Sequence, residues 1–484
     1  MKLKKIAALL AIAGISAPAL ATNGLNMEGY GPVATAMGGA SMAYDNGTAG
    51  LINNPATLGL MKSGTSRFDL AIGGLHPDVT TKVQGMFSSD SAGDAYYMPA
   101  IGYVRKDGKV TWGIGMMSQG GMGTEWGRSS VLSAGGIGAF GAFGATGLEQ
   151  RTELGIGRVM VPLTFDVSDT VRVGGTVDYL WGGMDMQMAL DGNTFGAMTA
   201  NSIMGGAAKD NANKRAVGYV GSKTNATMAG ALAGGFNYGY FNFSEGLGKF
   251  SQKLTTSGMA ANIGLTWQAT PALSVGAVYH ARSNLSDMTG TGSMVIGNPG
   301  NAGGQMVIPG TLKIVNFQWP ETFGVGLAYQ ANDKWNFVAD YKNIAWSNVF
   351  QQFHMIFTSA AMGGLVGEFG MNLNWKDQHV VQLGASYKMD DTTTLRFGAS
   401  LANQMVEEAN LIPLFPAVTT NHFTVGAGFA LSKASTLDFS LAHAPRVSVT
   451  KPGLAANAPF NVAGPAVSAG MAQTNWQLMF SQRF

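Results

Sequence analysis

The chain has 484 residues, of which only 12% are charged, and it contains no cysteine. Soluble domains carry about 25% charged residues, so the composition argues against an ordinary soluble domain. The lack of cysteine excludes disulfide scaffolds, thiolate metal sites and thiol catalysis. Glycine, at 69 residues, is about twice as frequent as average, yet it shows no collagen period.

The first 21 residues have the pattern of a secretory signal peptide. Three lysines precede an apolar run over residues 6–15, and an A-x-A cleavage site ends at Ala21. Removing these lysines leaves 27 basic residues against 28 acidic ones. The mature chain therefore has no excess of basic residues that would favour nucleic-acid binding. We expect an exported protein whose mature chain begins at Thr22.

Beyond residue 21 the chain has no run of about 18 apolar residues, the length that a membrane-spanning helix needs. It contains instead segments of about ten residues in which apolar and polar side chains alternate, the pattern of transmembrane barrel strands. We therefore expect an all-β fold, an antiparallel transmembrane β-barrel over residues 65–484. Fourteen strands are expected, over residues 67–75, 96–105, 109–118, 151–167, 171–188, 257–269, 273–285, 311–330, 335–350, 376–388, 393–405, 422–431, 436–449 and 475–484.

The connections between these segments alternate in length. Outer-membrane barrels have tight periplasmic turns and extended outer loops, so we expect both chain ends in the periplasm; a soluble β-sandwich is the alternative. The largest loop spans about residues 189–256. The last strand ends in Phe484, a common feature of bacterial outer-membrane barrels and the expected contact for the barrel assembly machinery. The short turns are residues 106–108, 168–170, 270–272, 331–334, 389–392 and 432–435.

Residues 22–64 precede the first strand and lack its pattern. They contain a short stretch of helical character, VATAMGGASMAY, between glycine-rich turns, followed by Asn54-Pro55-Ala56. Proline fixes φ and removes an N–H donor, and it favours extended geometry at the preceding residue. The segment is expected inside the barrel as a plug; a periplasmic extension or a linker is the alternative.

Several motifs are distinctive: Gly38-Gly39-Ala40, Asp45-Asn46, Asn54-Pro55-Ala56, GIGMMSQGGMGTEW over residues 113–126, and residues 319–353 with Pro320-Glu321 and Trp346-Ser347. In these motifs the chain resembles the FadL family of outer-membrane transporters for long-chain fatty acids and hydrocarbons. The resemblance implies a fourteen-stranded barrel whose mature N-terminus, residues 22–64, forms a hatch. It also implies an interruption of the third strand that opens the wall, so that a hydrophobic substrate leaves sideways into the bilayer.

Two sets of residues would carry these implied roles. Glycines inside a strand pattern signal a bulge or bend, so the third-strand break is placed at Gly120, Gly121, Met122 and Gly123. The hatch and the substrate path would involve Thr22, Asn23, Gly24, Asn54, Pro55 and Ala56. In the fifth strand, Met184, Met186 and Met188 share one face, and the sequence leaves open whether that face lines the lumen or meets lipid.

The outer loops are the expected capture site, because exposed apolar stretches mark binding surfaces. Apolar stretches lie at residues 135–148, 194–208 and 226–236, and the last two are candidates for short helices. A substrate carboxylate or a lipid phosphate is the candidate ligand for the basic residues of the largest loop, and a solvated charged face is the alternative. The residues concerned are Phe140, Phe143, Phe195 and Phe236 for capture, and Lys209, Lys214 and Arg215 for the acidic group.

These features together predict passive uptake of hydrophobic compounds, long-chain fatty acids or related hydrocarbons, across the outer membrane. The six histidines have no metal-ligand spacing, and no nucleophile motif appears, so we expect neither an enzyme nor a cofactor. The alternatives are a general diffusion porin and an outer-membrane lipid-active enzyme. The expected partners are hydrophobic small molecules and outer-membrane lipid, and the protein is expected to be a monomer.

Overall fold

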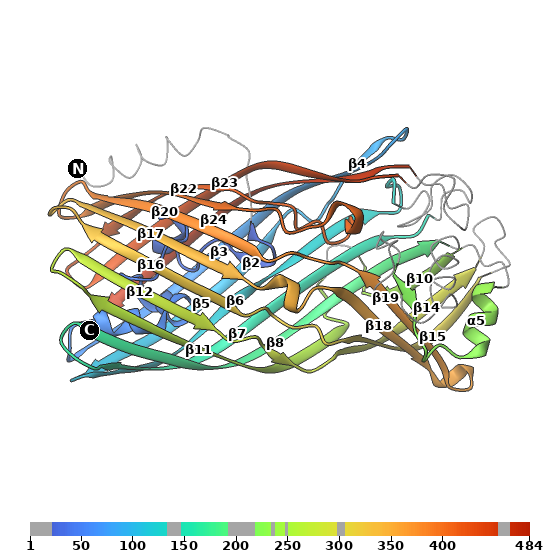
Figure 1. Ribbon diagram of the computed structural model, residues 1–484, viewed down its shortest axis with the longest axis horizontal. Coiled ribbons are helices and arrows are strands. Elements are labelled where there is room, and N and C mark those ends of the chain that lie inside the picture. Colours follow the sequence, from blue (N-terminus) through green and yellow to red (C-terminus); the bar gives the residue numbers. More distant parts are fainter. Residues whose placement is uncertain are drawn as a thin grey trace.

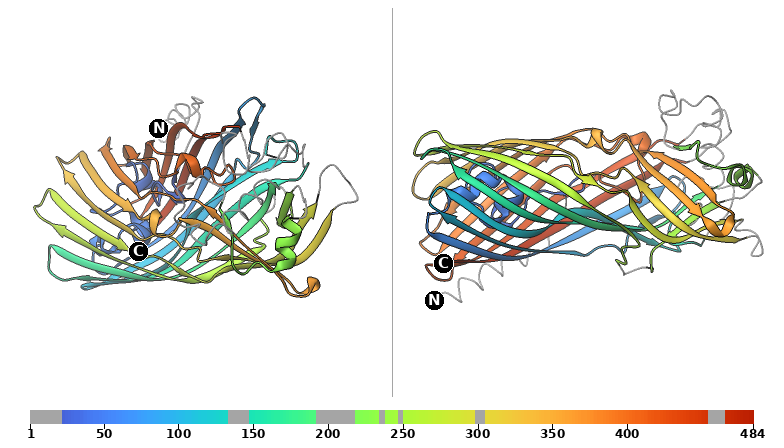
Figure 2. Two further views of the ribbon diagram at one scale, coloured as in Figure 1. Left: turned by 45° about the vertical axis from the view of Figure 1, so that its right-hand side comes forward. Right: turned by 90° about the horizontal axis from the view of Figure 1, so that it is seen from below.

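The computed structural model describes residues 22–132, 147–191, 218–233, 238–246, 250–297, 305–453 and 465–484. Long tilted strands run side by side around a barrel (Figures 1 and 2). Within these ranges, no helix has the length and apolar character needed to cross a membrane. The signal peptide expected over residues 1–21 lies outside the described residues.

The wall is one antiparallel sheet that closes on itself. The last strand, β24, pairs with the first long strand, β3, from Val83 opposite Val467 to Arg67 opposite Arg483. Closure removes the unpaired edges that would be costly in hydrocarbon. The ring passes in order through β3 (Thr65–Val83), β5 (Tyr96–Asp107), β6 (Val110–Gly127), β7 (Gln150–Asp166), β8 (Val171–Asp191), β11 (Leu254–Gln268), β12 (Leu273–His280), β16 (Thr322–Gln330), β17 (Trp335–Ile344), β20 (Gln378–Lys388), β21 (Thr393–Ala402), β22 (His422–Ala430), β23 (Ser435–Lys451) and β24 (Val467–Arg483).

The sheet has 24 strand segments, so the strand count differs from the fourteen expected. Residues 311–330, expected as one strand, belong to two, because Asn316 has a φ of 55° and the chain leaves the ladder as far as residue 321. Residues 352–372, expected as loop, form a hairpin. The further strands are β4 (Ser88–Asp90), β9 (Tyr219–Val220), β10 (Tyr238–Phe243), β13 (Asn284–Leu285), β14 (Met288–Gly297), β15 (Met306–Val315), β18 (Gln352–Ser359) and β19 (Leu365–Asn372).

The six short turns are present, and each joins two neighbouring ring strands, as predicted. The C-terminus lies at the same end of the barrel: Arg483 N donates to Ala434 O at 2.7 Å and Phe484 N to Ser66 O at 2.9 Å. We call this end of the barrel the turn end and the opposite end the loop end.

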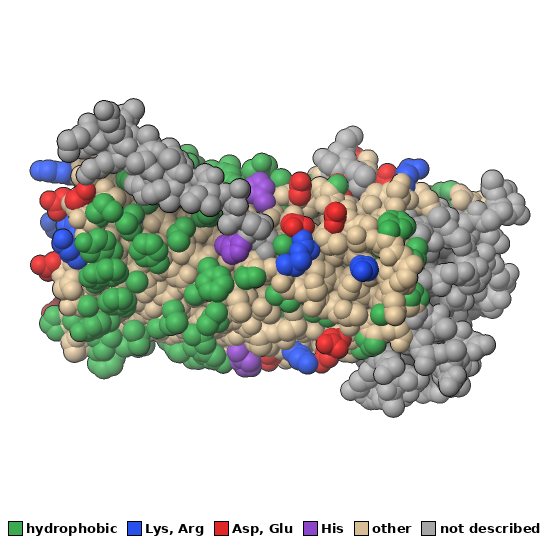
Figure 3. Space-filling view, turned by 90° about the horizontal axis from the view of Figure 1, so that it is seen from above, with side chains coloured by type: hydrophobic (Ala, Val, Ile, Leu, Met, Phe, Trp, Pro, Cys, Tyr) green, Lys and Arg blue, Asp and Glu red, His purple; other side chains and the backbone are tan. Residues whose placement is uncertain are grey.

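Burial alternates along the strands, as it does in a sheet with two different faces. On β7, Val161 and Phe165 are about half exposed, at 52% and 46%, whereas Met160 and Thr164 are buried. Large exposed apolar side chains gather near the turn end, and charged side chains of both signs lie on either side of them, at the turn-end rim and further towards the loop end (Figure 3). An outward apolar band of this kind is the surface with which a barrel meets lipid.

The N-terminal segment, residues 22–64, is enclosed by the strands. It is made of β1 (Thr22–Asn23), β2 (Asn26–Met27), α2 (Pro32–Thr35), η1 (Gly47–Ala49), α3 (Gly50–Asn53) and η2 (Pro55–Leu60). Its backbone N–H groups bond to strands from different parts of the ring, so it lies inside the barrel (Figure 2, blue). These bonds join Thr48 N to Asp69 on β3, Ser41 N to Asp340 on β17, and Gly38 N to Thr424 on β22.

A second segment also folds inward. Residues 403–421, here called the inner loop, connect β21 to β22, and residues 411–419 are all buried. The Gln404 side chain donates to Val418 O at 2.7 Å and closes the base of the loop. Near its tip, Leu414 O accepts bonds from Thr124 on β6 at 3.2 Å and from Thr152 on β7 at 2.6 Å. The inner loop therefore reaches from β21 and β22 to β6 and β7.

Candidate functional site

The wall opens beside β6. β5 and β6 are paired from Asp107 opposite Val110 only as far as Ala100 opposite Met117. Beyond that point β5 continues along β3 and β6 along β7, with no pairing between β5 and β6. The family resemblance implied that the third strand is interrupted. In the structure β6 is not interrupted: it stays paired with β7 and separates from β5. We call this separation beyond Met117 the gap.

Glycine is required where β6 bends at the gap. Two register shifts against β7 flank the bend, and Gly120 has a φ of 150°. A Cβ at Gly120 would lie 2.1 Å from Leu25 O, and one at Gly121 would lie 2.1 Å from Leu154 O. Both distances are well inside van der Waals contact. The glycine run identified in the sequence thus lies at the bend, and its function there is to bring β6 against the N-terminal segment.

A cavity of about 550 Å³ occupies the gap. Gln473 lines it and shares the inner side of β24 with Gln477, which donates to Gly29 O of the N-terminal segment. Gly155 also lines it, but shares the outer side of β7 with the exposed Val161. Because side chains alternate across a strand, the cavity connects the interior of the barrel with its outer face. Its apolar lining includes Leu75, Pro77, Met98, Met122, Leu154, Ile156, Trp181, Phe250 and Met471.

The N-terminal segment is bonded to the inner side of the gap. Asn26 Oδ1 accepts bonds from Gln119 Nε2 on β6 at 2.9 Å and from Trp319 Nε1 at 2.6 Å. Gly121 N donates to Leu25 O at 3.2 Å. These bonds give β6 the partner that β5 no longer provides. Movement of residues 25 and 26 would therefore expose the inner side of the gap.

Asn54-Pro55-Ala56 joins the N-terminal segment to the wall. Asn54 is extended, with φ −153° and ψ 106°, as the following proline favours. Its Oδ1 accepts from Ala56 N at 3.1 Å, and its Nδ2 donates to Met42 O at 2.7 Å and to Leu265 O of β11 at 3.2 Å. Pro55 O accepts from the Thr164 hydroxyl of β7 at 2.8 Å. The motif therefore has a fixed shape and direct contacts with two strands.

The wall has glycines where this motif docks, and they were not predicted from the sequence. A Cβ at Gly264 would lie 1.9 Å from Asn54 Oδ1, and one at Gly174 would lie 2.8 Å from the carbonyl carbon of Pro55. Isolated glycines inside strands mark bulges or close backbone approach. That signal was present in the sequence, although it does not say what approaches.

Charged side chains fix the segment near the turn end. Asp45 Oδ1 and Oδ2 accept from Arg67 Nη1 and Nη2 at 2.5 and 2.7 Å. Burial alone would raise the pKa of Asp45, but the Arg67 guanidinium outweighs it and holds that pKa below its usual value.

A second buried carboxyl of the N-terminal segment belongs to Glu28. Burial raises the pKa of Glu28 to about 7, and hydrogen bonds from its own backbone and from Asn475 lower that pKa by a smaller amount.

The remaining predicted path residues lie in the interior. Asn23 is buried, and a Cβ at Gly24, which has φ 71°, would meet Trp346 and Met405 at 2.8 Å. Thr22 pairs with Met27 in the β1–β2 hairpin. The methionine face of β8, which the sequence left open, is inward: Met184, Met186 and Met188 are all buried in the largest apolar cluster.

An aromatic cluster inside the loop-end half of the barrel was missed. Phe350 stacks on Trp375 at 4.7 Å between ring centroids, and Trp346 meets both rings edge-on at 5.3 and 5.5 Å. Phe415 of the inner loop packs on Phe353 at 5.3 Å. Residues 335–350 were expected as a strand and residues 351–375 as a loop, so the pattern did not predict that these rings would meet inside the barrel.

The outer capture site lies mainly outside the described residues. Of the stretches expected as short helices, residues 226–233 form α5 (Ala226–Ala233), which confirms that part of the prediction. The structure does not describe Phe140, Phe143, Phe195, Phe236, Lys209, Lys214 or Arg215.

Residues 8–474 match the family described as outer membrane protein transport protein (OMPP1/FadL/TodX). The chain belongs to this family. It is an outer-membrane β-barrel of a family of transport channels for hydrophobic compounds, which favours this class over a diffusion porin or a lipid-active enzyme.

Solved structures share the fold. The Pseudomonas putida toluene transporter TodX is 24% identical, over 95% of this chain and 99% of that chain, with a TM-score of 0.78. The Ralstonia pickettii toluene transporter TbuX is 27% identical over the same shares, with a TM-score of 0.72. A Pseudomonas aeruginosa FadL homologue is 14% identical over 97% and 99%, with a TM-score of 0.63.

A curated relative is known only as an uncharacterised protein from the 5′ region of the phosphoenolpyruvate carboxykinase gene of Chlorobium limicola. It is 51% identical over 85 residues, which are 18% of this chain and 41% of that protein. The match thus spans less than half of the relative's length.

Proposed function

We propose that this barrel takes up hydrophobic compounds passively, long-chain fatty acids or related hydrocarbons, and releases them sideways into the bilayer through the gap beside β6. The observation that carries the proposal is the cavity whose lining comes from both faces of the wall. Each CH₂ kept out of water contributes about 0.8 kcal/mol, so sideways release spares a long acyl chain roughly 10 kcal/mol. The similarity to two toluene transporters supports hydrocarbons as cargo.

In this proposal residues 22–64 are a hatch, and residues 65–484 form the barrel around it. Apolar outer loops capture the substrate, and movement of the hatch around Asn54-Pro55-Ala56 and residues 22–24 then opens the path to the gap. The bonds of Asn26 at the gap and of Asn54 at the wall support this role. The protein acts as a monomer in outer-membrane lipid, after cleavage near Ala21 and insertion through recognition of Phe484.

The function is tested by measuring uptake into cells that have an outer membrane, with and without the gene. Oleate and toluene are supplied separately, and entry of a small sugar is measured in parallel. We expect the gene to raise uptake of at least one hydrophobic compound and to leave sugar entry unchanged. No change for either compound, with faster sugar entry, would support a diffusion porin instead.

The exit route is tested by narrowing the gap. Gly155→Trp places an indole at the outer mouth of the cavity, where the Cβ would meet only the ring edge of Phe250, at 3.1 Å. We expect uptake to fall at least about tenfold, a loss of about 1.4 kcal/mol. Gly175→Trp is the matched control, because it adds the same side chain to the outer side of β8 away from the cavity. Equal uptake by the two variants would show that the substrate does not leave sideways through the gap.

A further inference from the structure

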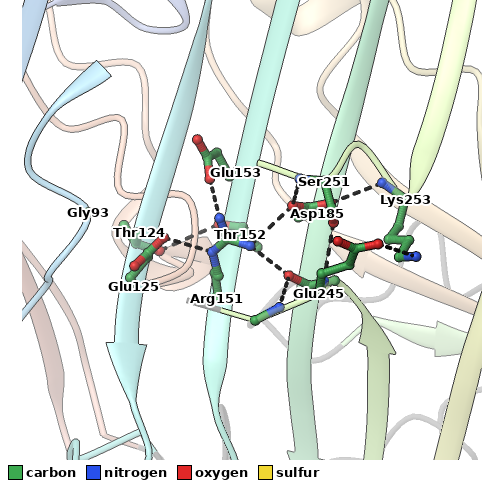
Figure 4. A network of polar contacts seen from close by, with 12 residues as sticks. Gly93, Thr124, Glu125, Arg151, Thr152, Glu153, Asp185, Glu245, Ser251 and Lys253 are labelled. Carbon is green, nitrogen blue, oxygen red and sulfur yellow. Dashed lines mark hydrogen bonds and ion pairs between the residues drawn. The ribbon is translucent and has the colours of Figure 1, made fainter. Parts of the chain in front are cut away.

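A buried cluster of charged side chains borders the gap on the outer side of the wall. At its centre is Arg151, whose side chain is 0% exposed and forms ion pairs with three carboxylates (Figure 4). Arg151 Nε lies 2.8 Å from Glu125 Oε1, Nη1 lies 3.1 Å from Asp185 Oδ2, and Nη2 bonds to Glu153. The cluster thus joins β6, β7 and β8 next to the cavity.

Strand register places the cluster at the cavity. Glu153 stands opposite Gly123 of the glycine run on one side and opposite Asp185 on the other. Glu153 and Arg151 share the outer side of β7 with Gly155, which lines the cavity. Among the described residues that line the cavity, Glu153 is the one charged side chain. A compound that passes through the gap therefore meets this carboxylate.

The cluster carries an excess of negative charge. Three carboxylates surround one guanidinium, and the neighbouring pair of Lys253 and Glu245, 3.0 Å apart, adds no net charge. The further bonds to Asp185 come from neutral donors: Ser251 N at 2.6 Å, the Ser251 hydroxyl at 2.8 Å and Lys253 N at 3.0 Å. These donors hold the carboxylate in place without cancelling its charge.

Arg151 cannot attract an anion into the gap. A guanidinium has five N–H donors, and Glu125, Glu153, Asp185 and the Ser244 hydroxyl take four of them. Its side chain has no exposed surface. A carboxylate in the cavity would therefore meet the field of Glu153 with no cation to pair with, and like charges repel strongly where water is excluded.

We propose that Glu153 sets the charge specificity of the gap, so that neutral hydrophobic compounds pass and compounds carrying a carboxylate are held back. This inference rests on the proposed sideways exit and narrows its cargo to the uncharged members of the class. Arg151 acts as a positioning residue, because it holds the Glu153 carboxylate at the cavity through the ion pair.

The test compares two compounds that differ only in head group, oleate and oleyl alcohol. Initial uptake is measured at pH 8.5, so that the carboxyl groups are ionised, in cells with the gene and after subtraction of the rates in cells without it. We expect the alcohol to enter at least about tenfold faster than oleate, a difference of about 1.4 kcal/mol. Uptake of oleate as fast as that of the alcohol would overturn the proposal without affecting the proposed function. If neither compound is taken up, both the proposed charge specificity and the proposed function are wrong.

Glu153→Gln should raise oleate uptake about tenfold and leave uptake of the alcohol unchanged. Glu149→Gln is the matched control: Glu149 pairs with Arg128 at 3.2 Å near the same end of β7 and does not line the cavity. Glu125→Gln removes one charge from the cluster without changing the cavity lining, so a smaller shift in the same direction is expected even where Glu153→Gln fails to fold. An unchanged ratio in a folded Glu153→Gln or Glu125→Gln protein would overturn the role of the cluster.

Discussion

The barrel interior holds two inward segments that are attached in different ways. The N-terminal segment is tied to the wall by polar groups: Asp340 Oδ2 accepts from Ser41 N at 2.6 Å and from Met42 N at 3.1 Å, and Gln382 Nε2 donates to Glu28 O at 2.7 Å. It also buries Leu51, Ile52 and Leu58 against Val104, Met117 and Met160 of the wall. The inner loop buries Leu411, Ile412, Leu414, Phe415 and Val418 in the largest apolar cluster.

The polar part of the attachment of the N-terminal segment is the part that a movement of the segment would break at the lowest cost in free energy. Water can replace a hydrogen bond at a net cost of only about 1 kcal/mol, whereas it cannot replace buried apolar contacts. Several buried wall atoms that face the N-terminal segment, Asp340 Oδ1, Gln382 Oε1 and Asp69 Oδ1, have no hydrogen-bond partner among the described residues. The polar attachment of the N-terminal segment is therefore incomplete, which agrees with the hatch movement proposed above.

The largest expected effect comes from the apolar attachment. Leu414→Ala in the inner loop, where the leucine is 0% exposed, should destabilise the barrel by roughly 2–5 kcal/mol. Urea unfolding in detergent measures this loss. Leu431→Ala is the matched control at an exposed turn, where the leucine is 51% exposed, and should cost about 0.5 kcal/mol or less. Similar losses in both variants would mean that the inner loop is not a packed element.

The attachment of the N-terminal segment should weaken as the pH rises. Burial raises the pKa of Glu28 from 4.5 to about 7, so the protonated form is favoured in the folded state. Glu28 therefore contributes about 3 kcal/mol to the free energy of unfolding. This contribution is fully present below pH 4.5 and is lost as the pH rises through 7. Protease cleavage within residues 22–64 should therefore be faster at pH 8.5 than at pH 5. Glu28→Gln should remove this dependence, and a pH dependence that persists in that variant would assign it to another group.

The regular features of the wall were predictable from sequence, because they depend on local chemistry. Strand alternation and polar turns such as Ala331–Lys334 are local patterns, and the extended geometry of Asn54 follows from Pro55. The glycine run at 120–123 predicted a bend for the same reason. Each of these signals lies within a few residues of the structure that it specifies.

The features that depend on distant neighbours were not predictable. The sequence gives no reason to place Pro413 and Pro416 inside the barrel, because the partners of the inner loop lie on β6 and β7, more than 260 positions away. Arg151 and Asp185 occupy an outward face of the wall, and their partners there, Ser244 and Ser251, come from a connection about 60 to 90 positions further along the chain. Pairwise contacts of this kind leave no pattern in a single sequence.

A moderate effect is expected from the polar attachment. Asp340→Ala removes the acceptor for two backbone N–H groups of the N-terminal segment, and bonds to a charged group contribute about 1.5–3 kcal/mol. We expect the segment to loosen and small sugars to leak through the barrel in a liposome swelling assay. Asp333→Ala, in an exposed turn, should not leak. A tight Asp340→Ala barrel would show that the segment is held by something other than this carboxylate.

The smallest effect is expected where the two attachments meet. Leu414 O accepts from both Thr124 and Thr152, so Thr124→Val leaves the carbonyl with its shorter bond, at 2.6 Å, and should cost about 1 kcal/mol or less. Because Thr124 follows the glycine run of β6, the same substitution frees that strand from the inner loop. If the inner loop holds the gap at a fixed width, uptake should change more than stability does. Unchanged uptake in Thr124→Val, together with the expected small loss in urea unfolding, would mean that the gap is shaped by its glycines and by residues 25 and 26 alone.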